Sequence, residues 1–200
     1  MLACTILTFA MCADPKVAGA IAFGDLTVPI VWSHVAVASC ADIGRQITAE
    51  SGLTTIETSW HTVETQVTRS IVSGHLVAKL AAAHIDMTAV SWDHMSPGEQ
   101  DALAGGYRAT LWHEIGHLRT GQASVDAINA EPGFSAPTVD EYNALAKQRG
   151  DAAAERLNAD QEEYDRVAEH GLRQDTLPPP LGGPDTIVVC PSGSGGRRRH

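Results

Sequence analysis

Residues 96–117 read SPGEQDALAGGYRATLWHEIGH, and this stretch decides how the second half of the chain folds. It opens with a helix-start signature, because Ser96 can act as N-cap, Pro97 takes the first helical position and Glu99 completes a capping box. Apolar residues then recur at the spacing of one helix face. They are Tyr107, Leu111, Ile115 and Leu118. We therefore predict a helix over about residues 97–120 that buries this face.

The same stretch ends in two histidines and a glutamate, in the order His113-Glu114-Ile115-Gly116-His117. Residues four apart lie one turn apart on the same helix face, so His113 and His117 can both bind one Zn²⁺. Glu114 lies beside such a metal without binding it, where its carboxylate can take a proton from zinc-bound water. The pattern predicts metal-assisted peptide hydrolysis, with Glu114 as the general base. Two histidines packed on an ordinary helix are the alternative.

A catalytic zinc site usually has three protein ligands and one open position. The pattern that places a Gly and a third His within six residues of the second His fails here, since Thr120 and Ala123 stand at those positions. The remaining candidates are His170 and Asp165, near the end of a helix predicted over residues 139–170. Histidine is the commoner ligand, whereas Asp165 could instead hydrogen-bond a ligand imidazole. The sequence favours His170, with Asp165, another residue or no third ligand as alternatives.

Several segments of the chain resemble one bacterial family, described as predicted secreted zinc-dependent proteases and also catalogued as a domain of unknown function. The run from Trp92 to His117 is similar to its zinc-motif block. Tyr164-Asp165 followed by His170-Gly171 matches its second block, a Tyr-Asp pair shortly before a His-Gly pair. The segment Thr55 to Val63 is similar to its extended Thr-x-Trp segment, so the resemblance covers roughly residues 50–172.

This resemblance implies the same roles as the zinc motif. By it, His113 and His117 are zinc ligands, Glu114 is the base, and the third ligand is His170 or Asp165. One position departs from the family pattern: a Thr usually stands three residues after the Asp, and here that residue is Ala168. At this position the chain therefore lacks the side-chain hydroxyl that the family places near the ligands.

The distribution of residue types predicts an α+β fold, with an antiparallel sheet in the N-terminal half and zinc-binding helices in the C-terminal half. Residues 25–39 and 53–91 are rich in Val, Ile and Thr with partial alternation, and the short turns between them favour antiparallel strands. The other expected elements are a short helix at 42–50, helices at 97–120, 124–130 and 139–170, a loop at 132–137, a break at Gly150 and a strand at 186–190.

We expect three parts in this chain. Residues 1–20 form a signal or truncated signal segment, residues 21–174 a single metallopeptidase-like domain, and residues 175–200 an extended or disordered tail. The apolar stretch Leu2 to Ala13 has secretory length but no basic residues before it, and it is too short to span a membrane. It predicts a secreted or periplasmic protein, with the cytoplasm as the alternative.

The four cysteines bear on the same question. Removal of a signal segment would take Cys4 and Cys12 with it. Cys40 and Cys190 would then remain as an even pair that can form one disulfide in an oxidising compartment. Reduced thiols without a role are the alternative.

Composition narrows the classes of function. A 200-residue chain that is 44% hydrophobic can bury one core, and a net charge of −10 disfavours binding to nucleic acid. We expect a peptide or protein substrate, no nucleic acid and no stable membrane insertion. The sequence thus predicts a zinc-dependent peptidase. The alternatives are an intracellular peptidase with the same motif that cleaves a regulatory protein, and a non-catalytic zinc-containing binding module.

Overall fold

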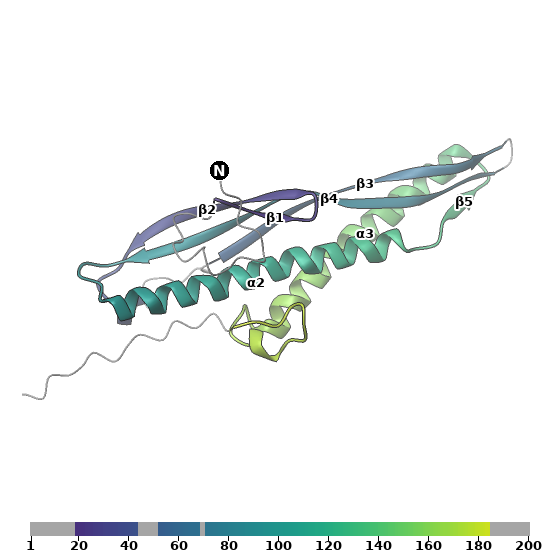
Figure 1. Cartoon of the computed structure of the whole chain (residues 1–200). Coiled ribbons are helices and arrows are strands. Elements are labelled where there is room, and N and C mark those ends of the chain that lie inside the picture. Colours follow the sequence, from purple (N-terminus) through teal and green to yellow (C-terminus); the bar gives the residue numbers. More distant parts are fainter. Residues whose placement is uncertain (1–18, 44–51, 69–70, 185–200) are drawn as a thin grey trace, which may run out of the picture.

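The computed structural model describes residues 19–43, 52–68 and 71–184, which form one mixed sheet with two long helices (Figure 1). The strands are β1 (Ala20–Phe23), β2 (Leu26–Ala36), β3 (Gly52–Val67), β4 (Val72–Ser91) and β5 (Phe134–Ala136). The helices are α2 (Pro97–Asn129) and α3 (Val139–Ala168), with short 3-10 helices η2 (Cys40–Asp42) and η3 (Gln174–Thr176). The predicted α+β class, with the sheet mainly in the N-terminal half and the helices in the C-terminal half, is confirmed.

The strands follow the order β1-β2-β4-β3, with β5 also paired to β4. Three of the pairings are antiparallel, as predicted, but β2 and β4 run parallel. The short-turn argument applies only to consecutive strands, and β3 separates β2 from β4 in the sequence. At 20 residues, β4 is long enough for β2 and β5 to pair with its two ends, since β2 pairs near Ile85 to Ser91 and β5 near Val72 to Gly74.

Helix α2 begins as the sequence predicts. The Ser96 hydroxyl accepts a hydrogen bond from the Glu99 amide, and the Glu99 carboxylate accepts one from the Ser96 amide, so the capping box is present. Ile115 and Leu118 of the apolar stripe are fully buried against the sheet. The helix is longer than predicted, because it continues without a break through the segment expected as a separate piece at 124–130. The helix has about nine turns, and its buried face packs on the sheet from Leu103 to Ile128.

Helix α3 passes through Gly150, where the sequence predicted a break. The glycine is explained by packing instead, since a Cβ at this position would lie 2.2 Å from the ring of Trp60 on β3. Thr138 caps the helix by accepting a hydrogen bond from the Glu141 amide. The preceding segment, predicted as a loop, contains the short strand β5.

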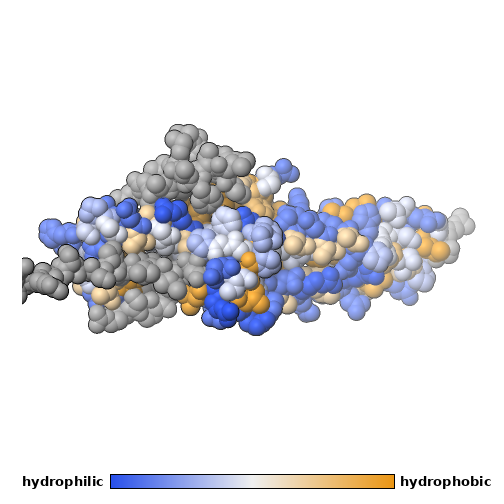
Figure 2. Space-filling model, turned by 60° about the horizontal axis from the view of Figure 1, so that its bottom comes forward, coloured by the Kyte–Doolittle hydropathy of each residue, from blue (hydrophilic) through white to orange (hydrophobic). Residues whose placement is uncertain are grey.

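The two helices lie on the same side of the sheet (Figure 1). Their outer surface, among the residues that the structure describes, is predominantly hydrophilic with scattered apolar side chains (Figure 2). No helix in the described ranges combines the length and the apolar character needed to cross a membrane. The predicted signal segment up to residue 18, most of the predicted 42–50 helix and the 186–190 strand lie outside the described residues.

Cys40 lies in η2 and is disulfide-bonded. Its partner lies outside the described residues, so the pairing with Cys190 stays a prediction.

Candidate metal centre

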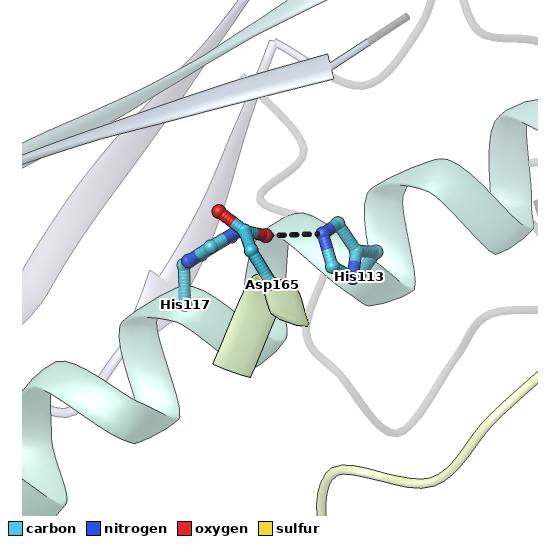
Figure 3. Close-up of side chains that lie close together, drawn as sticks. All are labelled: His113, His117 and Asp165. Carbon is cyan, nitrogen blue, oxygen red and sulfur yellow. Dashed lines mark hydrogen bonds and ion pairs between the residues drawn. The ribbon is translucent and has the colours of Figure 1, made fainter. Parts of the chain in front are cut away.

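Three side chains from the two helices meet at one point: His113 and His117 from α2, and Asp165 from α3 (Figure 3). The Asp165 Oδ1 atom lies 3.1 Å from His113 Nε2 and 3.0 Å from His117 Nε2. One nitrogen from each histidine and one carboxylate oxygen all lie within 4.8 Å of one another. The predicted pair of ligands on one helix face is thus joined by a carboxylate from a second helix.

Tyr164 explains how α3 approaches α2 so closely at this point. Its ring stacks on His113 with centroids 5.0 Å apart and meets His117 edge-on at 4.8 Å. A Cβ at Gly116 would lie 1.9 Å from the Tyr164 hydroxyl oxygen, so the glycine within the motif makes room for the tyrosine. The hydroxyl donates to the His113 carbonyl oxygen at 3.2 Å, and burial raises the pKa of Tyr164 to about 12. Tyr164 thus packs α3 against both histidines of α2.

Two glutamine side chains fix the orientation of the imidazoles. Gln174 Oε1 lies 2.9 Å from His113 Nδ1, and Gln161 Oε1 lies 2.8 Å from His117 Nδ1. The amide nitrogen of Gln161 donates to the His117 carbonyl oxygen at 3.2 Å, and that of Gln174 donates to the Leu181 carbonyl oxygen. A carbonyl oxygen can only accept, so each amide must present its own oxygen to the imidazole. Both Nδ1 atoms therefore carry a proton, so the neutral form of each imidazole has its lone pair on Nε2.

The consequence is that three acceptors point at one another: the Nε2 lone pairs of His113 and His117 and the carboxylate of Asp165. Such groups repel unless a proton or a cation lies between them. Tetrahedral zinc with ligands at about 2.0–2.1 Å requires ligand atoms about 3.3 Å apart. The two separations from Asp165 Oδ1 to the imidazole nitrogens are close to this value, and all three ligand atoms lie within 4.8 Å of one another. The three residues therefore fit a metal ion, although imidazole and carboxylate ligands suit several first-row metals.

The pKa values show the same attraction for positive charge. Burial alone would raise the pKa of Asp165, but hydrogen bonds with His113 and His117 outweigh burial and hold that pKa well below its usual range. Burial alone would lower the pKa of His117, but hydrogen bonds with Asp165 and Gln161 outweigh it, and the pKa is raised. A proton and a metal ion would thus compete for the same lone pair on His117.

Glu114 lies next to this group and is 3% exposed. Its Oε2 accepts a hydrogen bond of 2.8 Å from the Thr54 hydroxyl of β3, which also contacts the Glu114 carbonyl oxygen at 3.1 Å. A Cβ at Gly52 would lie 2.5 Å from Glu114 Oε1, so the start of β3 packs directly on this carboxyl group. Burial raises the pKa of Glu114 above its ordinary value. The side chain is thus held in one place, and it keeps a proton to a higher pH than an exposed glutamate does.

His170, which the sequence favoured as third ligand, does not join the group. Its Nδ1 lies 3.8 Å from Asp165 Oδ1, and its side chain is 60% exposed. Helix α3 ends at Ala168, and Glu169, His170 and Gly171 all have positive φ, so the chain turns away directly after the helix. The structure therefore favours the alternative, Asp165, over His170. Ala168, where the family pattern has Thr, is fully buried.

Sequence reasoning missed four residues of this site: Gly52, Thr54, Gln161 and Gln174. Gln161 stands four residues before Asp165, so helical spacing could have placed both on the face that meets α2. Gly52 and Thr54 reach Glu114 only through the fold of the sheet, and no signal in the sequence connects them. Gln174 follows the last turn of α3 and likewise carries no signal.

Residues 38–171 match a family described as bacterial protein of unknown function (DUF922). The chain belongs to this family. No curated protein and no solved structure matches it. The DUF922 match includes His113, Glu114, His117, Asp165 and His170, whereas Gln174 lies beyond its end. This agrees with the predicted resemblance as far as the domain of unknown function is concerned, and the protease description of that family stays a prediction for this chain.

Proposed function

We propose that this protein is a zinc-dependent peptidase in which His113, His117 and Asp165 hold the metal and Glu114 is the general base. The observation that carries the proposal is the convergence of three acceptors, two of them in the fixed Nδ1–H tautomer, beside a buried glutamate. Two histidines packed on an ordinary helix would not need to point their acceptor atoms at a carboxylate. Three protein ligands are also the number that leaves one position open for water or substrate.

A zinc ion bound here would lower the pKa of a coordinated water and polarise the carbonyl group of a peptide bond. Glu114 would accept the proton of the attacking water and pass it to the leaving amine. Thr54 keeps one oxygen of Glu114 in place through its 2.8 Å hydrogen bond. The raised pKa of Glu114 suits both steps, since a base that must also act as an acid works best with a pKa near the working pH.

Export of the chain remains part of the proposal. The disulfide at Cys40 supports an oxidising compartment, outside the cytoplasm. An intracellular peptidase that cleaves a regulatory protein is the alternative if the first residues are not a signal segment.

A non-catalytic zinc-binding module is the second candidate, and one observation favours it. His170 Nδ1 lies only 3.8 Å from Asp165 Oδ1, so a small shift of the turn after α3 would bring a fourth ligand to the metal. Four protein ligands are typical of closed, structural zinc sites. Catalytic turnover therefore separates the two candidates.

The test compares wild type with Glu114→Gln, both loaded with zinc, on a mixture of peptides whose cleavage is followed by mass spectrometry. The amide keeps the shape of the carboxylate but cannot accept the proton, so we expect one zinc per chain in both proteins and a rate about 10²–10⁴-fold lower in the variant. Glu162→Gln, an exposed glutamate on α3, is the matched control and should cleave like wild type.

The possible failures of this test are distinct. Equal rates in wild type and Glu114→Gln would remove Glu114 from the mechanism. Bound zinc without cleavage in either protein would support the binding module. Absence of zinc from the wild type would rule out the metal centre.

A further inference from the structure

We propose that Gln161 and Gln174 are positioning residues for the metal centre, each of which orients one ligand histidine. Because Gln174 belongs to the C-terminal segment, residues 172–184, this segment is needed for metal binding. This inference rests on the proposed metal site but not on the proposed reaction. The family match ends at residue 171, so the proposal extends the site into a segment that the match does not cover.

The two glutamines act on the histidines in the same way from different elements. Gln161 lies on α3, one turn before Asp165, and reaches His117 Nδ1 at 2.8 Å. Gln174 lies in η3 and reaches His113 Nδ1 at 2.9 Å. Each ligand histidine therefore has its own acceptor on the side away from Asp165. Acceptors of this kind fix the tautomer and the ring orientation of metal-binding histidines.

Gln174 is fully buried and every atom of its amide group is used. Besides His113, its amide nitrogen donates to the Tyr164 hydroxyl at 2.9 Å and to the Leu181 carbonyl oxygen. The Gly183 amide in turn donates to the Gln174 carbonyl oxygen at 3.1 Å. A buried amide with this set of partners cannot rotate without breaking several hydrogen bonds at once.

The segment that carries Gln174 also contacts α2 through residues 180–183. The Trp112 indole donates to the Leu181 carbonyl oxygen at 3.3 Å, and Arg119 Nη1 donates to the Pro180 carbonyl oxygen at 2.6 Å. The Arg119 guanidinium also lies 4.6 Å from the centre of the Trp112 ring. A Cβ at Gly183 would lie 2.3 Å from that ring, so the segment is in close contact with α2. Because Trp112 directly precedes His113, these contacts place the segment next to the first ligand of the metal centre.

Loss of either amide oxygen would free one imidazole to take the other tautomer. A proton on Nε2 would then point at Asp165 and form a hydrogen bond where the metal must bind. Removal of the acceptor behind a ligand histidine typically weakens metal binding about 10–100-fold. We expect this loss for each glutamine separately.

The experiment uses Gln161→Met and Gln174→Met, because methionine keeps the length of the side chain and removes its acceptor. Zinc affinity is measured by competition with a chromophoric chelator. Both variants should bind zinc about 10–100-fold more weakly than wild type. Gln122→Met is the control, since the Gln122 amide donates to Asp126 on the exposed face of α2 and should leave the affinity unchanged.

A second measurement separates positioning from a general loss of structure. Long-range ¹H–¹⁵N NMR spectra of the metal-free protein, at a pH high enough for neutral rings, report the tautomer of each histidine. Wild type should show Nδ1–H at both ligands. Gln161→Met should change His117 alone, and Gln174→Met should change His113 alone. Gln161 is only partly buried, so its variant keeps the test open even if Gln174→Met does not fold.

Unchanged zinc affinity in folded variants, or unchanged tautomers, would overturn the proposal. Weaker zinc binding in the variants with no peptide cleavage in wild type would uphold it and refute the peptidase. If wild type bound no zinc, the proposed function would fail, and the tautomers alone would decide whether the glutamines position the rings.

Discussion

The two ends of the contact between α3 and α2 are built from opposite kinds of side chain. At one end, α3 meets α2 through polar groups around Asp165, two imidazoles and two amides. At the other end it packs on α2 and the sheet through apolar side chains. These are Leu76, Ala78, Leu80, Val125, Ile128, Ala153 and Leu157.

This difference distinguishes the side chains that stabilise the fold from those that form the proposed metal site. Burial of apolar side chains contributes about 25 cal/mol per Å² and needs no particular partner. Burial of imidazoles and a carboxylate costs free energy unless each group is paired. Apolar contacts of the kind found at this end hold helices on sheets in many proteins. The polar end, by contrast, is favourable only with a proton or a metal ion among its three acceptors.

The largest expected effect comes from removing the ligands at the polar end. His113→Ala, His117→Ala and Asp165→Ala should each weaken zinc binding roughly 10³-fold or more, because the large binding free energy of such sites is shared among few ligands. His170→Ala should weaken it far less, since that side chain is largely exposed and lies 3.8 Å from Asp165. The measurement is chelator competition combined with metal analysis.

This series decides between the two assignments of the third ligand. If His170→Ala lost zinc while Asp165→Ala kept it, the original prediction of His170 would be correct, and the carboxylate would serve only to orient an imidazole. Full zinc content in both His113→Ala and His117→Ala would remove the site altogether.

The next effect concerns the apolar end. Leu157→Ala should lower the free energy of unfolding by about 2–4 kcal/mol, because Leu157 is 8% exposed and a cavity would remain between α3 and the sheet. Zinc affinity should stay within a few-fold of wild type, since the substitution is two turns of helix from Asp165. Chemical denaturation of the metal-free proteins gives the first value, and chelator competition gives the second.

Val31→Ala is the control for this prediction, because Val31 is an apolar residue that is 52% exposed on β2 and should change stability little. A large loss of zinc affinity in Leu157→Ala would contradict the separation of the two ends.

The two ends also differ in how far the sequence predicts them. The capping box at Ser96 and the stripe containing Ile115 are local patterns, and the structure confirms both. The pair His113 and His117 is equally local, since helical spacing alone places both on one face. The third member of the site depends on where α3 ends. Two non-glycine residues in the left-handed region after Ala168 turn His170 away, and no pattern in the sequence reports that conformation.

Contacts between distant segments were beyond the sequence for the same reason. The parallel pairing of β2 with β4 follows from the placement of β3 on the far side of β4. The acceptor for His113 comes from Gln174, which is 61 residues away and follows the end of a helix. Propensity and spacing describe neighbours in the chain, whereas these contacts depend on how whole elements pack.

The smallest expected effect is the dependence of the stability of the metal-free protein on pH. The folded-state pKa of His117 is raised, so its contribution is fully present below the unfolded pKa of about 6.5 and is lost as the pH rises through the higher folded value. The pKa of Asp165 is lowered, so its contribution is present above about 3.9 and is lost only in stronger acid. Without metal, the protein should be most stable between these limits.

Metal binding reverses the trend on the alkaline side, because the ion must displace the proton from His117 and therefore binds more tightly as the pH rises. Melting temperatures measured with zinc and with chelator should thus lie closest near pH 6 and separate by a few degrees more at higher pH. His117→Ala should abolish both trends, and His34→Ala, an exposed histidine on β2, should preserve them. If the melting temperature of the chelated wild type does not change through this range, His117 and Asp165 share no proton. In that case no proton offsets the repulsion among the three acceptors at the polar end of the metal-free protein.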